Sequence, residues 1–218
     1  MDTDRDNEVT VWCGSIELGG SLGLPQDANG VILFAHGSGS SRHSPRNNQV
    51  ARTLRQHGLG TLLLDLLTPE EDRDARKRFD IALLTERLRA AREWLRDEPD
   101  TSNHRVGLFG ASTGAAAALQ LAAALGHDIA AVVSRGGRPD MAGEAELDKV
   151  SAPTLLIVGG EDGVVIDLNR QAFAQLNHCE KELVIIPGAT HLFEEPGKMD
   201  QVAALATDWF ARHCRTLI

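Results

Sequence analysis

The sequence predicts an α/β protein with a mainly parallel, doubly wound sheet and helices on both faces. Two observations carry this prediction. Continuous apolar runs of strand length recur along the chain, and segments with helical periodicity separate most of them. Strands that alternate with helices pair in parallel, because each crossover returns the chain to the same end of the sheet.

The apolar runs predict six central strands. They are expected at residues 31–35, 60–66, 106–109, 129–133, 154–158 and 183–186. A run without polar interruptions is typical of a strand that is covered on both faces. Residues 9–24, which several glycines interrupt, predict a hairpin of exposed strands at one edge of the sheet.

The segments between the strands predict five helices. They are expected at about residues 47–57, 79–95, 115–125, 167–176 and 199–213. The amphipathic pattern of the second places Phe79 and Trp94 on its buried face and Arg87 among its solvated charges. The third is uniformly apolar, which predicts a central, buried helix. Residues 69–78 are expected to form a charged loop.

Length and composition predict one domain over residues 1–218. A chain of 218 residues that is 42% hydrophobic can bury a sizeable core. Only a short, lid-like connection is expected, over residues 135–152, which predicts an open site and a preference for small acyl groups. The net charge of −9 argues against nucleic acid or an anionic membrane as a partner.

The cysteines and the start of the chain predict a soluble, cytoplasmic protein. The three cysteines at positions 13, 179 and 214 have neither disulfide nor zinc-site spacing, so reduced packing residues are expected. The first nine residues, MDTDRDNEV, are too polar for a signal peptide. No metal cluster, P-loop or dinucleotide fingerprint occurs, so no metal and no cofactor are expected.

The segment RVGLFGASTG, residues 105–114, predicts a strand, a tight turn and a helix with Ser112 at the apex. Gly110 and Gly114 leave room for the strand and helix to approach each other, and the turn exposes the hydroxyl as a nucleophile. The Thr113 N–H would begin the helix, where it can donate to an oxyanion. The alternative is a chance pattern in which Ser112 only caps the helix.

Two later loops supply the partners that a serine nucleophile needs. Asp162 follows the strand predicted at 154–158, and His191 follows the last strand. A histidine base oriented by a carboxylate activates a serine hydroxyl. Glu161 is the alternative carboxylate, although the spacing favours Asp162. His36 begins the glycine-rich loop 36–41 and is interpreted as a structural residue that shapes this loop.

Five segments together resemble the α/β-hydrolases of the dienelactone-hydrolase-like group, some of which are fused to phosphoribosyltransferase domains. These segments are HGSGSS (36–41), GASTG (110–114), SRGGRPD (134–140), GGEDGVV (159–165) and GATHLFEEPG (188–197). The resemblance implies a Ser112–His191–Asp162 triad and an oxyanion hole formed by the Thr113 and Ser38 N–H groups. Dienelactone hydrolases proper use a cysteine nucleophile, so Ser112 favours ordinary ester hydrolysis over dienelactone hydrolysis.

Three arginines and the class of substrate each have alternative interpretations. Arg135 and Arg138 could bind a substrate carboxylate or pair with Glu70, Glu71 or Asp140, and Arg42 could line the entrance or lie in an exposed loop. A small-molecule ester or lactone is the expected substrate. A lactonase of the dienelactone hydrolase type, an acyltransferase and a non-catalytic binding protein are the alternatives. The sequence does not determine the oligomeric state.

Overall fold

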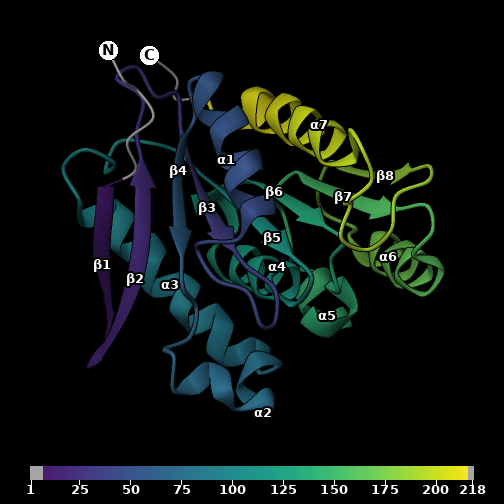
Figure 1. Cartoon of the computed structure of the whole chain (residues 1–218), viewed down its shortest axis with the longest axis horizontal. Coiled ribbons are helices and arrows are strands. Elements are labelled where there is room, and N and C mark those ends of the chain that lie inside the picture. The colour runs from purple at the N-terminus through teal and green to yellow at the C-terminus, as the bar shows by residue number, and fades with distance from the viewer. Residues whose placement is uncertain (1–6, 216–218) are drawn as a thin grey trace.

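A single eight-stranded sheet forms the centre of the computed structural model, which describes residues 7–215 (Figure 1). Its strands are β1 (Asn7–Cys13), β2 (Ile16–Gly23), β3 (Val31–Ala35), β4 (Gly60–Leu64), β5 (Val106–Ala111), β6 (Ile129–Arg135), β7 (Thr154–Gly159) and β8 (Lys181–Ile186). The order across the sheet is β1-β2-β4-β3-β5-β6-β7-β8. The pairs β1–β2 and β2–β4 are antiparallel, and the other five are parallel. The predicted mainly parallel sheet is confirmed.

Helices cover both faces of this sheet, as predicted. They are α1 (Pro45–Gln56), α2 (Ala75–Arg78), α3 (Ile81–Asp97), α4 (Thr113–Leu125), α5 (Glu144–Leu147), α6 (Gly163–Gln175) and α7 (Lys198–His213), with the 3₁₀ turns η1 (Glu71–Arg73), η2 (Gly126–Asp128) and η3 (Pro139–Ala142). Helices α1 and α7 pack together on one face, whereas α3 and α4 pack together on the other (Figure 1). Among the helices of residues 7–215, none is both long and apolar enough to cross a membrane.

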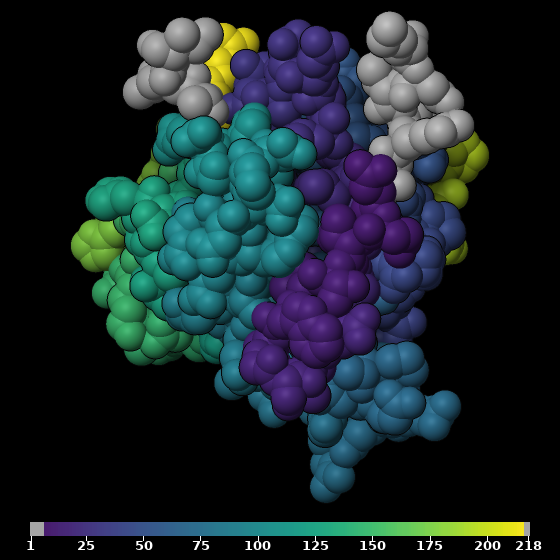
Figure 2. Space-filling view, turned by 90° about the vertical axis from the view of Figure 1, so that its left-hand side faces the viewer, coloured from purple at the N-terminus to yellow at the C-terminus, as the bar shows by residue number. Residues whose placement is uncertain are grey.

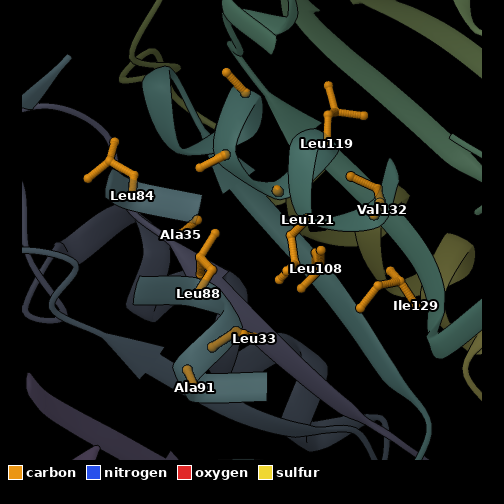
Figure 3. Close-up of a cluster of buried hydrophobic side chains, with 14 of the residues drawn as sticks. Leu33, Ala35, Leu84, Leu88, Ala91, Leu108, Leu119, Leu121, Ile129 and Val132 are labelled. Carbon is orange, nitrogen blue, oxygen red and sulfur yellow. The ribbon is translucent and has the colours of Figure 1, made fainter. Parts of the chain in front are cut away.

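The core is divided by the sheet into two apolar clusters. Figure 3 shows the cluster on the α3–α4 side, where side chains of β3, β5 and β6 meet those of the two helices, among them Leu33, Leu108, Val132, Leu88 and Leu119. Each of these five is fully buried, which stabilises the fold by about 1.5–3 kcal/mol per side chain. The central strands are therefore held rigidly, and the loops at their carboxyl ends start from fixed positions.

The two edges of the sheet differ from the sequence-based expectation. The β1–β2 hairpin occupies one edge, where Figure 2 shows β1 beside α3 on the surface. Most of β2 is nevertheless buried, because it lies between β1 and β4. The opposite edge is β8, whose residues are mostly half-buried rather than enclosed as predicted. Apolar composition alone did not distinguish this edge strand from the central ones.

The segment expected to be a charged loop at residues 69–78 contains η1 and α2 instead and projects from the body (Figure 2). Asp80 caps the start of α3 by accepting from the Leu83 N–H at 3.0 Å. Phe79 therefore precedes α3 and is 52% exposed, which corrects its predicted place on the buried face. Arg87 is buried rather than solvated, because its guanidinium pairs with Glu71 at 3.1 Å.

Candidate active site

The chain turns sharply at Ser112, between β5 and α4. Ser112 has φ 51° and ψ −121°, in the left-handed region that residues with a side chain rarely occupy. Its N–H donates to the Arg135 carbonyl at 3.3 Å, and its own carbonyl accepts from the Arg138 N–H at 3.0 Å. Backbone at the end of β6 thus holds the strained turn from one side, as expected where a strained residue is functional.

The glycines on either side of Ser112 are required by close backbone approach. A Cβ on Gly114 would overlap the carbonyl oxygens of Ala35 and His36, and one on Gly110 would overlap the backbone of Ala115. Any side chain at these positions would separate the turn from β3 and α4. The steric reason inferred from the sequence for the two glycines is therefore confirmed.

Asp162 and His191 meet at the carboxyl ends of β7 and β8. The distance from Asp162 Oδ2 to His191 Nδ1 is 2.6 Å, and the side chains are 17% and 38% exposed. A carboxylate this close to Nδ1 fixes the ring and leaves Nε2 free for proton transfer. Of the two consecutive acids, Asp162 is the one whose carboxylate contacts the ring in the described part of the chain. Helix α6 starts directly after Asp162, four residues earlier than predicted.

Gly136 brings the histidine loop close to the Ser112 turn. It follows Arg135, whose carbonyl accepts the Ser112 N–H. A Cβ on Gly136 would lie 3.0 Å from the His191 carbonyl oxygen and 3.6 Å from His191 Cε1. The imidazole is thus packed against the same strand end that holds Ser112. The three residues predicted to act together follow the carboxyl ends of β5, β7 and β8, which lie on the same side of the sheet with β6 between β5 and β7.

Two backbone N–H groups close to Ser112 in the fold were predicted to form an oxyanion hole. Thr113 is the first residue of α4, and Ser38 lies in the exposed part of the loop after β3. Within residues 7–215, neither N–H donates to another backbone group. A Cβ on Gly37 would lie 3.0 Å from Ser112 Cβ and 3.7 Å from its Oγ, so the loop that carries Ser38 lies close to the Ser112 side chain. Free donors on both sides of a hydroxyl are what an oxyanion requires.

His36 fixes the shape of this loop. Its buried ring accepts the Leu66 N–H at Nε2, at 3.0 Å, and its Nδ1 lies 2.9 Å from the Gly37 carbonyl. The acceptor role of Nε2 assigns the proton to Nδ1, which donates to Gly37. Burial lowers the pKa of His36, so the ring is neutral at neutral pH. The structural role inferred from the sequence agrees with these contacts.

A narrow surface hollow lies beside the loop after β3 that carries Ser38. Its walls include Gly37, Ser38 and Thr113, together with Asp72 from η1 and Arg78 from α2. Neither Asp72 nor Arg78 is among the residues that the sequence predicts for this site. The loop after a central strand borders the site in this type of sheet. The charged residues directly after the strand predicted at 60–66 were therefore the sequence feature that could have indicated Asp72 and Arg78.

The three arginines that could bind substrate have different surroundings. The guanidinium of Arg42 pairs with Asp65 and Glu8, and that of Arg138 donates to both carboxylate oxygens of Asp140. The guanidinium groups of Arg42 and Arg138 are therefore both paired with carboxylates of the protein itself. Arg135 is buried, and no carboxylate of residues 7–215 pairs with it.

The remaining reactive side chains do not contribute to this site. The three cysteines are free, and burial raises the pKa of Cys214 to about 12 and also raises that of Cys179. A raised pKa keeps a thiol protonated and a poor nucleophile. In the described part of the chain, no group of three or more histidine, cysteine, aspartate or glutamate residues could hold a metal ion.

Comparison with known proteins agrees with this geometry. The chain is 54% identical to a dienelactone hydrolase from Anabaena variabilis, with a TM-score of 0.93 over 97% of this chain and 99% of that structure. A serine hydrolase without a lid from Xanthomonas campestris shares the fold, with 22% identity and a TM-score of 0.75 over 96% and 95% of the two chains.

Curated relatives from two strains of Mycobacterium tuberculosis are 55% identical over 96% of this chain and are named as phosphoribosyl transferases. This chain spans 47% of their length, so their name describes proteins about twice as long. The dienelactone hydrolase family profile matches residues 18–217. The chain therefore belongs to the dienelactone hydrolase family.

Proposed function

We propose that the protein is a serine hydrolase that cleaves small carboxylic esters, including lactones, through an acyl-enzyme. The observation that carries this proposal is the 2.6 Å contact between His191 Nδ1 and Asp162 Oδ2, beside a serine in a strained turn. A turn histidine with only a structural role needs neither a carboxylate at this distance nor a neighbouring serine in a strained turn.

The proposed reaction proceeds in two stages. Ser112 Oγ attacks the ester carbonyl carbon while His191 Nε2 takes the hydroxyl proton, and the Thr113 and Ser38 N–H groups stabilise the oxyanion. The tetrahedral intermediate then collapses, and the leaving alcohol receives the proton from His191. Water repeats the sequence on the acyl-enzyme, which releases the carboxylic acid and restores Ser112.

Small acyl groups are proposed because little chain covers the site. The connection from β6 to β7 contains only η3 and the four-residue helix α5. An enclosed apolar channel for a long acyl chain would require a larger insertion. Acetate and butyrate esters are therefore expected to react faster than a ten-carbon ester, and the reverse order would contradict this part of the proposal.

The nucleophile can be identified directly with a fluorophosphonate probe. The expected result is one covalent adduct, located at Ser112 by mass spectrometry and lost in Ser112→Ala. The variant should also lose on the order of 10⁶-fold in turnover while keeping its circular dichroism spectrum. Adduct formation at another residue, or hydrolysis by Ser112→Ala within tenfold of the wild type, would refute the assignment. Complete failure of labelling would support a non-catalytic protein instead.

A further inference from the structure

Asn169 is a polar residue in the middle of the buried face of α6. The buried side chains of this helix are Val165, Asn169 and Ala172, which lie on one face at helical spacing. None of the Asn169 surface is exposed. An apolar side chain here would pack the helix against the sheet without burying an amide, which is unfavourable unless every polar atom finds a partner. Packing alone therefore does not explain why this position carries an amide.

The amide of Asn169 makes two hydrogen bonds, and it donates both. Its Nδ2 donates to the Gly137 carbonyl at 3.0 Å and to the Val165 carbonyl, one turn earlier in the helix, at 2.8 Å. Because both neighbours are acceptors, the nitrogen of the amide is the atom that faces them. Its Oδ1 is buried and has no partner within residues 7–215, which lowers stability. The bond to Gly137 connects the helix to another segment of the chain, and this connection is the distinctive feature of the side chain.

The segment that receives this bond contacts two parts of the candidate active site. We call residues 136–138, which follow β6 directly, the bridging segment. A Cβ on Gly136 would lie 3.0 Å from the His191 carbonyl oxygen. The Arg138 N–H donates to the Ser112 carbonyl at 3.0 Å. The bridging segment thus lies against the histidine loop at one end and holds the nucleophile turn at the other.

The helix that donates this bond carries the third member of the predicted triad. Asp162 is the N-cap residue of α6, and its carbonyl accepts the Ile166 N–H at 2.9 Å. Its carboxylate does not cap the helix and instead lies 2.6 Å from His191 Nδ1. Asn169 follows about two helical turns later. The position of the Asp162 carboxylate therefore depends on how α6 is held against the rest of the protein.

The bridging segment is also packed tightly on its other side. A Cβ on Gly137 would lie 2.6 Å from Ala115 Cβ in α4, and closer still to Ser134 Oγ in β6. Backbone that touches a neighbouring helix and strand this closely cannot adjust to a displaced partner. The segment therefore has a fixed position, and the Asn169 amide sets the position of α6 relative to it.

We propose that Asn169 is a positioning residue, whose hydrogen bond to Gly137 keeps Asp162 in register with Ser112 and His191. This inference rests on the proposed esterase function. The fully buried side chain acts through the backbone of the bridging segment and does not touch the substrate. A displacement of about 1 Å between reacting groups slows a reaction by about 100-fold, so the chemical steps depend on this bond whereas ester binding does not.

The steady-state kinetics of Asn169→Leu test the proposal. Leucine has a similar size and no hydrogen-bond donor. With 4-nitrophenyl butyrate, kcat should fall by about 10- to 100-fold, while KM should stay within about twofold of the wild-type value. Fluorophosphonate labelling of Ser112 should slow in parallel, because it uses the same nucleophile and base without an ester. A kcat within about twofold of the wild type would overturn the proposal.

Gln120→Met is the matched control. Gln120 lies in α4, and its Nε2 donates to the Ala142 carbonyl at 3.1 Å, at the far end of η3. This is also a bond from a side-chain amide to the connection between β6 and β7, but it does not reach the bridging segment. Gln120→Met should keep the wild-type kcat. A loss equal to that of Asn169→Leu would show that any loosening of this connection slows the reaction, which overturns a specific role of Asn169.

Asn169→Thr isolates the bond that leaves the helix and keeps the test valid if Asn169→Leu does not fold. A threonine hydroxyl in a helix donates to the carbonyl four residues earlier, so the bond to Val165 is retained. The Gly137 carbonyl then has no donor from α6. The variant should show the same loss of kcat as Asn169→Leu. A wild-type kcat in Asn169→Thr would mean that the bond to Gly137 is not needed, which overturns the proposal.

Proton NMR separates this inference from the proposed function, because it needs no turnover. The proton between His191 Nδ1 and Asp162 should give a low-field resonance, identified by its loss in His191→Ala. In Asn169→Leu this resonance should broaden, because a displaced α6 opens the contact to exchange with water. An unchanged resonance would overturn the positioning role. If the resonance broadens but the wild type neither hydrolyses esters nor reacts with fluorophosphonate, the proposed function fails and the positioning role stands.

Thermal unfolding distinguishes positioning from a contribution to stability. Asn169→Leu removes a buried oxygen that has no partner, so its Tm should equal or exceed that of the wild type although kcat falls. A Tm lowered by more than about 5 °C, with an unchanged kcat, would assign a purely structural role and overturn the proposal.

Discussion

Asp162 Oδ2 and His191 Nδ1 are 2.6 Å apart, although 29 positions separate the two residues in the chain. The contact depends on β7 and β8 being parallel neighbours, since their carboxyl ends then lie side by side. It also shows which of two consecutive acids contacts the histidine.

Asp162→Asn should reduce kcat by about 10⁴-fold with little change in stability. The amide keeps the shape of the side chain but favours the wrong tautomer of His191 and does not stabilise its cation. Glu161→Gln is the matched control, because it changes the adjacent acid by the same chemistry. Hydrolysis of 4-nitrophenyl butyrate measures both. A larger loss in Glu161→Gln than in Asp162→Asn would reverse the assignment.

Gly114→Ala should destabilise the protein by about 3 kcal/mol or more. The added methyl group would overlap the carbonyl oxygens of Ala35 and His36, and backbone cannot move aside as a flexible side chain can. Gly163→Ala is the control, since no atom lies within 4 Å of the Cβ position there. Urea unfolding gives both free energies. Equal stability of the two variants would mean that the turn has more room than the contacts indicate.

The free energy of unfolding should decrease as the pH falls below 6.5, partly because of His36. Its pKa in the folded protein lies below the unfolded value of 6.5, because burial disfavours the charged ring. Between these two pKa values the unfolded chain binds a proton that the folded protein does not, so acid favours unfolding. The stability that the neutral His36 ring contributes is fully present above pH 6.5. Below that pH, the free energy of unfolding falls by at most about 1.4 kcal/mol per pH unit because of His36.

Urea titrations between about pH 5 and pH 7.5 can measure this slope. His36→Asn should flatten it and weaken the hydrogen bonds to Leu66 and Gly37. His57→Asn, at an exposed position after α1, should leave the slope as in the wild type. An identical slope in His36→Asn would show that other groups cause the acid sensitivity. His213 is one candidate, because burial lowers its pKa as well.

Arg87→Met should destabilise the protein by about 3 kcal/mol, because the largely buried Glu71 carboxylate then loses one of its two cationic partners. The two side chains are 7% and 11% exposed, and Glu71 also contacts Lys77 at 3.3 Å. The double change Glu71→Gln with Arg87→Met should recover part of the loss, since it removes both charges. Arg96→Met on the exposed face of α3 is the control. If chemical denaturation shows that the double variant has a lower free energy of unfolding than both single variants, the pairing is contradicted.

The Glu71–Arg87 pair illustrates what periodicity cannot predict. On a helical wheel Arg87 belongs to the charged face, which is normally solvated. In the fold, η1 and α2 return over α3 and cover that position. Phe79 shows the converse error, because the cap at Asp80 starts the helix after it. The Arg87 outcome depends on a contact between segments, which a local pattern does not contain. The Phe79 outcome depends on the local Asp80 cap, which the periodicity of apolar residues does not take into account.

The sequence by itself determined the alternation of strands and helices, the turn at Ser112 and the loops that hold Asp162, His191 and His36. These features follow from local apolar runs, from glycine spacing and from the rule that the carboxyl ends of parallel strands lie on the same side of a sheet. Only the tertiary structure decided that Asp162 rather than Glu161 contacts His191, and that β8 is an edge strand. It also decided that Arg135 has no carboxylate partner within residues 7–215 whereas Arg42 pairs with Asp65 and Glu8, because pairing and burial arise between residues far apart in the chain.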